Sequence, residues 1–88
     1  MQNSNEGSLT REFVAKREET RAILRGHMDA RGLRERDGWR ISESIRQRDG
    51  RTELVMRPIH LQLPAPDDLE CVVAIDEPGS SITTECDT

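Results

Sequence analysis

The sequence predicts a small α+β domain, in which an N-terminal amphipathic helix is followed by a three-stranded antiparallel β-meander. Apolar residues recur at helical spacing in the first third of the chain, and a period-two alternation replaces that spacing from Trp39 onward. The pair Asp49-Gly50 interrupts the alternation, and Asp-Gly between two alternating segments is a strong signal for a tight β-hairpin. A helix followed by consecutive strands is typical of the α+β class.

The helix is expected over residues 9–36. At 100° per residue one face collects Leu9, Phe13, Thr20, Ile23, Leu24, His27 and Met28. Gly26 lies inside this stretch and costs about 1 kcal/mol relative to alanine, so a bend or break is expected there. Gly32 or Gly38 is expected to end the helix.

Domain boundaries follow from where the apolar residues lie. Residues 1–8 are polar and unpatterned, which predicts a flexible arm, and Ser8 or Thr10 can cap the helix that follows. Residues 9–76 form the single folded domain. Residues 77–88 contain turn formers, acids and few apolar side chains, which predicts a flexible acidic tail.

The hairpin has a register that its two-residue turn determines. This register sets Arg48 opposite Arg51, Arg46 opposite Glu53, and Ile45 opposite Leu54. The buried face is then expected to hold Trp39, Ile41, Ile45, Leu54 and Met56. The other face is expected to hold Arg46, Arg48, Arg51, Glu53, Val55 and Arg57.

The alternation changes phase at Pro58, because Ile59, Leu61 and Leu63 continue the apolar series at odd positions. A strand can switch faces in this way only at a bulge or a break, which proline tolerates. Residues 64–68 form a loop, and residues 69–76 predict the third strand. One face of that strand is apolar, and the other is partly apolar at Val72 and Ala74, which suggests an edge or two-sided strand that a second copy or another protein can cover.

The core is thin, because Leu, Ile, Val and Phe make up only 18 of the 88 residues. A domain of this size usually needs reinforcement, and we expect a homodimer. Two cysteines are too few for a disulfide framework, so Cys71 is interpreted as a small buried hydrophobe and Cys86 as a free thiol. His27 and His60 lack the paired spacing with these cysteines that a zinc site requires. No metal and no cofactor are expected.

No apolar run approaches the roughly 20 residues of a membrane span, and the polar opening does not resemble a signal peptide. The expected compartment is the cytoplasm, with no membrane contact.

The charge is unevenly distributed along a chain whose formal net charge is −4. Residues 9–36 carry +3 and residues 64–88 carry −7. Arg17, Arg21 and Arg25 repeat at i, i+4, which places like charges in a ladder on one side of the helix. The ladder is interpreted either as a solvated face or as an anion site. The acidic end can fold back on the ladder or face a basic partner.

These patterns predict a small non-enzymatic regulatory or adaptor protein that binds a larger protein and self-associates. No triad spacing, phosphate-binding glycine loop or small-molecule substrate site is visible in the sequence. The alternative is a dimeric DNA-binding regulator that uses the basic helix and hairpin, although the pI of about 5.1 is low for that class. The expected partner-binding residues are Arg17, Arg21, Arg25, Arg46, Arg48, Arg51, Arg57, Val72 and Ala74.

Overall fold

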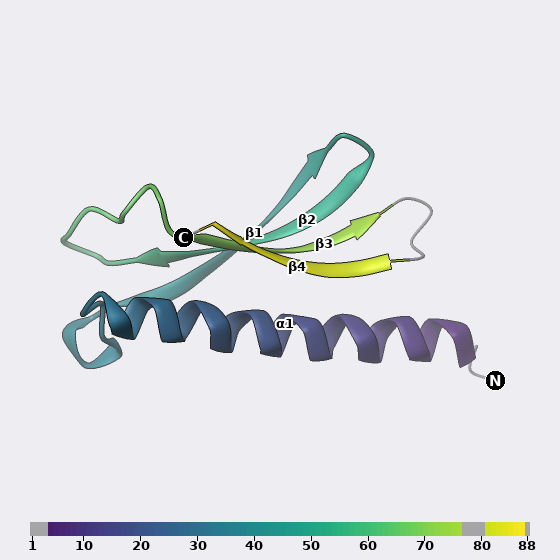
Figure 1. The fold of residues 1–88 in the computed structure, drawn as a ribbon, viewed down its shortest axis with the longest axis horizontal. Helices are drawn as coiled ribbons and strands as arrows, with labels where there is room; N and C mark the ends of the chain where they lie inside the picture. Colours follow the sequence, from purple (N-terminus) through teal and green to yellow (C-terminus); the bar gives the residue numbers. More distant parts are fainter. Residues whose placement is uncertain (1–3, 77–80, 88) are drawn as a thin grey trace.

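A computed structural model describes residues 4–76 and 81–87, which form one long helix packed on one face of an antiparallel sheet (Figure 1). The elements are α1 (Ser4–Ala30), the 3₁₀ helix η1 (Glu35–Asp37), β1 (Arg40–Arg48), β2 (Arg51–Ile59), β3 (Glu70–Asp76) and β4 (Ser81–Asp87). The strands lie side by side in chain order, β1-β2-β3-β4. The α+β class is confirmed, but the sheet has four strands where the sequence predicted three.

The helix α1 is continuous over 27 residues and starts earlier than predicted. It begins at Ser4, so Ser8 and Thr10 lie inside the helix, and residues 4–8 of the predicted flexible arm are helical. Once a helix has formed, each further residue adds a hydrogen bond, which outweighs a modest capping preference. Gly26 neither bends nor breaks α1. Gly26 is exposed, and no atom lies near the position that a Cβ would occupy. The glycine therefore makes helix formation less favourable but disrupts no packing.

Gly32 ends the helix, as one of the two alternatives predicted. Its φ of 77° is left-handed, and its N–H donates to the Asp29 carbonyl at 3.1 Å while the Leu33 N–H donates to the Met28 carbonyl at 2.8 Å. This pair of bonds is the Schellman motif, which satisfies carbonyl groups that the helix end would leave unpaired. Leu33 and Met28 both pack in the core, so the motif also returns the chain to the sheet.

The β1–β2 hairpin has the predicted turn and register. Asp49 and Gly50 both have positive φ, 52° and 74°, as a type I′ turn requires. The cross-strand pairs include Arg48 with Arg51, Arg46 with Glu53 and Ile45 with Leu54. Asp-Gly therefore determined the local geometry as the sequence indicated.

Strand β2 runs straight through Pro58, so the predicted change of phase is wrong. Pro58 pairs with Ile41 and is fully buried. The β2–β3 ladder ends at Met56. Proline's missing N–H therefore faces the side on which β3 no longer pairs, and the sheet loses no hydrogen bond. Ile59, Leu61 and Leu63 are exposed as a consequence and do not replace Leu54 and Met56 in the core.

Residues 81–87, assigned to the flexible acidic tail, instead form the edge strand β4. Cys86 lies opposite Cys71 in the β3–β4 ladder, and the two are joined by a disulfide. Neither cysteine is therefore the free side chain that the sequence interpretation assumed. The tail prediction for 77–80 and 88 falls outside the described residues.

The core lies between α1 and the sheet, mainly against β3 and β4 (Figure 1). Its buried residues are Leu24, Met28, Trp39, Leu54, Met56, Leu69, Cys71, Val73 and Ile82. Each fully buried large apolar side chain contributes about 1.5–3 kcal/mol. Ile45, expected in this core, is 65% exposed, because the β1–β2 hairpin rises away from α1 toward its tip (Figure 1).

Candidate functional site

The predicted partner-binding arginines lie on two surfaces, one on each side of the sheet. Arg17, Arg21 and Arg25 belong to α1, on the side of the helix nearest β1. The hairpin arginines project from the opposite, outer face of the sheet, which no helix covers in the described residues (Figure 1). The structure therefore does not bring the two groups together into one basic surface.

Two of the three arginines in the helical ladder converge on one acid of the sheet. Arg17 forms two hydrogen bonds with Glu43 of β1, from Nε to Oε1 at 2.9 Å and from Nη2 to Oε2 at 3.2 Å. Arg21 pairs with the same carboxylate. Glu43 is only partly exposed. Because Arg17 and Arg21 both bind its carboxylate, they hold β1 against α1. Bidentate arginine–carboxylate pairs are among the stronger charge-assisted contacts.

Arg25 lies apart from this clamp. It pairs at 3.7 Å with Glu35 of η1, beyond the end of the helix. The acidic C-terminal end of the chain does not reach the ladder within the described residues, so the predicted fold-back of that end onto it is not seen. Glu85 of β4 contacts a hairpin arginine instead.

The outer face carries a network of ion pairs that runs across the strands. Arg46 of β1 donates from Nε to Glu53 of β2 at 2.7 Å and lies 3.5 Å from Glu70 of β3. Arg57 of β2 lies 3.6 Å from the same Glu70. Glu53 is 4% exposed. A carboxylate buried to that degree needs a charged partner, and Arg46 supplies one.

A second part of this network crosses toward β4. Arg51 of β2 lies 3.0 Å from Asp76 of β3 through Nε and donates from Nη2 to Glu85 of β4 at 2.5 Å. Arg51 therefore links β2 to β4 across the outer face of β3. We call Arg46, Arg51, Glu53, Arg57, Glu70, Asp76 and Glu85 the outer-face network.

The network raises the pKa of two arginines further above their already high ordinary values. For Arg46 the main cause is the hydrogen bond to Glu53, and for Arg51 it is the hydrogen bond to Glu85. Both groups are solvent-accessible, so these shifts indicate well-formed contacts and not large stabilisation.

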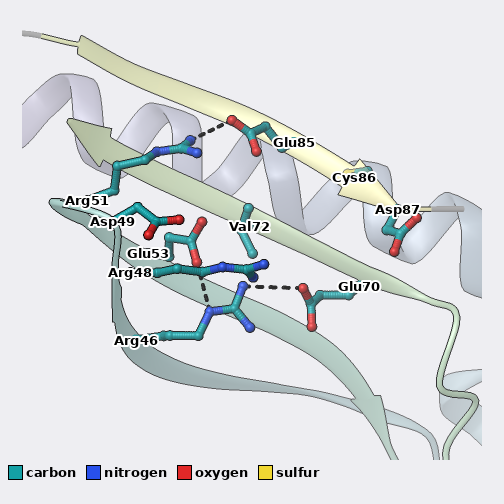
Figure 2. Close-up of a pocket in the computed structure, with 10 residues that line it drawn as sticks. All are labelled: Arg46, Arg48, Asp49, Arg51, Glu53, Glu70, Val72, Glu85, Cys86 and Asp87. Carbon is teal, nitrogen blue, oxygen red and sulfur yellow. Dashed lines mark hydrogen bonds and ion pairs between the residues drawn. The ribbon is translucent and has the colours of Figure 1, made fainter.

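A shallow hollow of about 380 Å³ lies over this network (Figure 2). Its lining residues are Arg46, Arg48, Asp49, Arg51, Glu53, Glu70, Val72, Glu85, Cys86 and Asp87. Five carboxylates outnumber three guanidinium groups there, so the hollow is a poor receptor for phosphate. Arg48 forms no ion pair with the described residues, and its side chain extends across the sheet in Figure 2.

Val72 and Ala74 do not form the open apolar surface that the sequence predicted. Strand β3 is an inner strand between β2 and β4, so the interpretation as an edge strand is wrong. Val72 is 5% exposed and Ala74 is fully buried. Val72 lines the larger hollow beside the network, and Ala74 lies between Glu53 of β2 and Thr83 of β4.

The exposed apolar side chains lie elsewhere: Val14 and Ile23 on α1, and a larger group around β1 and the end of β2. Ile45 projects from β1, and Ile59, Leu61 and Leu63 continue from β2 into the following loop. A second hollow, of about 230 Å³, is lined by Gly38, Arg40, Ile59, His60 and Leu61.

His60 serves this region as a structural residue. Its Nδ1 accepts hydrogen bonds from the backbone N–H groups of Gln62 and Leu63, at 3.0 and 3.1 Å. Its Nε2 therefore carries the proton and donates to the Asp37 carbonyl at 2.9 Å. The ring also packs on Trp39, with centroids 5.0 Å apart.

Sequence reasoning missed Glu43 and the disulfide. Glu43 was one of several acids on an alternating segment, and only the packing of α1 shows that two arginines reach it. The disulfide had a weak signal: Ile82, Thr84 and Cys86 alternate and contain β-branched residues, which indicates a strand. The acidic composition of the segment concealed that signal.

Comparison with protein-family models, curated proteins and solved structures finds no match to this chain. The one long helix, α1, lacks the apolar character needed to cross a bilayer over the residues described. The described residues also contain no group of three histidine, cysteine or acidic side chains arranged to hold a metal ion.

Proposed function

We propose that this chain is a small non-enzymatic regulatory or adaptor protein that binds another protein and associates as a homodimer. The observation that carries the proposal is how the arginines are used. Six of the seven predicted partner-binding arginines contact acids of the same chain, as Arg17 and Arg21 do with Glu43 and Arg46 does with Glu53.

Internal pairing weakens the alternative of a DNA-binding regulator. DNA binding depends on cations that neutralise phosphates, and each arginine would first have to leave a carboxylate. The outer-face network also brings its own acids to any approaching phosphate. The hairpin is therefore a weak candidate for a phosphate-binding surface, and contact with protein is the better-supported use of the molecule.

The exposed apolar residues Ile59, Leu61 and Leu63 are the best-supported partner surface. They lie in one short segment beside the smaller hollow. Apolar side chains clustered beside a concavity and ringed by polar residues are typical of protein-binding sites. The surface would take an apolar side chain of a protein partner and requires no cofactor.

The disulfide bears on the compartment. Disulfides persist in oxidising compartments and are rare in the cytoplasm. The Cys71–Cys86 bond therefore favours an oxidising compartment over the cytoplasm that the sequence suggested. Alkylation of the protein in freshly lysed source cells, followed by mass measurement, would show whether both thiols are blocked or free.

Two measurements test the proposed function. In the first, tagged protein is captured from source-cell extract beside an Ile59→Ser/Leu61→Ser variant, with Arg11→Ser as an exposed control. The proposal expects a partner that the control retains and the double variant loses. In the second, retardation of a random DNA duplex at about 50 mM salt, lost steeply as salt rises, would favour the DNA-binding alternative.

A further inference from the structure

The sheet has two edges, and they differ in what they expose. Strand β4 is tied to β3 by the disulfide, and its Ile82 is 8% exposed. Strand β1 presents Ile45, which is 65% exposed. Helix α1 packs mainly on β3 and β4 and reaches β1 through Arg17 and Arg21, and the tip of β1 rises away from the helix (Figure 1). The open edge that carries an exposed apolar side chain is therefore β1.

The backbone of β1 shows which groups this edge offers. In an antiparallel ladder, alternate residues direct both N–H and C=O toward the neighbouring strand. The two-residue turn is closed by the hydrogen-bonded pair Arg48 and Arg51, so even-numbered residues of β1 face β2. The odd-numbered residues, including Glu43, Ile45 and Gln47, direct their N–H and C=O groups away from the sheet. An edge of this kind is a template for another strand.

The side chains of β1 restrict how a second copy can pair with it. A two-fold axis perpendicular to the sheet pairs the strand with itself in antiparallel orientation. Registers centred on Glu43, Ser44, Arg46 or Gln47 each set like charges directly opposite, which is unfavourable. Centring on Ser44, for example, sets Arg40 opposite Arg48.

The register centred on Ile45 avoids this opposition. Its cross-strand pairs are Ile45 with Ile45, Ser44 with Arg46, Glu43 with Gln47, and Ser42 with Arg48 of the second copy. Ile45 meets Ile45 at the centre, and the outward N–H and C=O groups of Ile45 pair reciprocally across the axis. The exposed side chain and the unpaired backbone groups are satisfied in the same arrangement.

We propose that β1 is a self-association strand, which pairs with β1 of a second copy in antiparallel register about Ile45 to form a continuous eight-stranded sheet. The inference rests on the homodimer in the proposed function and names its interface. Arg17 and Arg21 contribute by holding Glu43 on the helix side of β1, which keeps the edge ordered for pairing.

Cysteine cross-linking tests the register. The native cysteines are bonded to each other, so Ile45→Cys adds the one free thiol among the described residues. Directly opposed residues have Cα atoms about 5.5 Å apart, within the roughly 7 Å limit for a disulfide. We expect mild oxidation to give a covalent dimer in high yield. Gln47→Cys is the matched control, because in this register its two copies lie about 13 Å apart along the strands.

A charge exchange tests the same contact without covalent chemistry. Ile45→Lys and Ile45→Glu each place like charges at the centre of the pairing, and each is expected to weaken the dimer at least about tenfold. An equimolar mixture of the two variants should recover a heterodimer, which a merely destabilised fold would not do. Ile45 is exposed, so circular dichroism should show that both variants fold as the wild type does.

Light scattering after size exclusion separates the outcomes. A dimer with a Kd below about 100 μM would be detected at that protein concentration. If the wild-type chain is still monomeric there, both the homodimer and the β1 interface are overturned. A dimer that the Ile45 variants leave intact, or that Gln47→Cys cross-links as well as Ile45→Cys, overturns the β1 interface alone. A dimer that the variants weaken and their mixture restores supports it.

Discussion

The two hairpins of the sheet hold their strands together in different ways. The β1–β2 hairpin depends on its turn, where Asp49 and Gly50 adopt positive φ and determine every cross-strand pair that follows. The β3–β4 hairpin depends on a covalent bond, because Cys71 and Cys86 join directly opposed positions. The first hairpin is specified locally, whereas the second needs two residues 15 positions apart to meet.

This difference extends to how each outer strand is attached. Strand β4 is joined to α1 by a hydrogen bond of 2.8 Å between the hydroxyls of Thr20 and Thr84, as well as to β3 by the disulfide. Strand β1 is joined to α1 by the arginine clamp on Glu43, and its tip rises away from the helix (Figure 1). One edge strand is therefore fixed by a disulfide and a helix contact, whereas the tip of the other lies away from the helix.

Removing the disulfide should have the largest effect on stability of the changes considered for the two hairpins. Cys71→Ala/Cys86→Ala is expected to lower the free energy of unfolding by about 2–4 kcal/mol, since the bond no longer restricts the unfolded chain. Urea denaturation measures the change. Dithiothreitol should destabilise the wild type by a similar amount and leave the double variant unaffected. Equal stability of the two proteins would show that β4 needs no covalent attachment.

Straining the turn of the other hairpin comes next. Gly50→Ala forces a side chain into left-handed backbone and is expected to cost about 1–2 kcal/mol. Gly26→Ala is the matched control, since the same change at an exposed helical position should stabilise the protein by up to about 1 kcal/mol. Thermal unfolding of both variants measures the change in stability, which should be a loss for Gly50→Ala and a gain for Gly26→Ala. A neutral Gly50→Ala would mean that cross-strand contacts, and not the turn, maintain the register.

Loosening β4 from the helix should have a smaller effect. Thr20→Val removes a buried hydroxyl that bonds to Thr84, and we expect a loss of about 1 kcal/mol. Thr83→Val, on the exposed side of the same strand, is expected to change stability by less than about 0.5 kcal/mol. Hydrogen exchange at β4 amides should rise in the first variant only. Equal hydrogen exchange at the β4 amides of the two variants would show that the Thr20–Thr84 hydrogen bond does not stabilise β4.

The smallest effect is expected at the tip of the open edge. Ile45→Ser should change the stability of the monomer by less than about 0.5 kcal/mol, because the side chain already contacts water. The measurement needs dilute protein, since association would otherwise raise the apparent stability. A loss above about 2 kcal/mol would place Ile45 in the core after all.

Sequence alone predicted the fold class and one hairpin because the decisive signals were local. Asp49-Gly50 carries its geometry in two residues, and Gly32 was among the expected helix ends. Pro58 was misjudged because its effect depends on where β3 stops pairing, which only the assembled sheet shows. Strand β4 was missed because its stability comes from contacts with Cys71 and Thr20, both distant along the chain.

For the candidate site, sequence placed the hairpin arginines on the correct face and set Arg46 opposite Glu53, but it did not give the partners of the other arginines. An arginine ladder looks the same in a sequence whether its charges face solvent, phosphate or an internal acid. Here the arginines pair with internal acids. Glu43 of the sheet pairs with the helix, and Glu53 and Glu70 pair with arginines of neighbouring strands.

The outer-face network also substitutes for a missing layer of structure. No helix of the described residues lies on that side, and the side chains of the network share the outer face with the buried Val55, Val72 and Ala74. Shortening Arg46 or Arg51 to alanine would therefore expose an apolar patch on the outer face and promote aggregation even if the fold were unchanged. These arginines therefore bear on solubility as well as on stability, since Arg46 also pairs the buried Glu53.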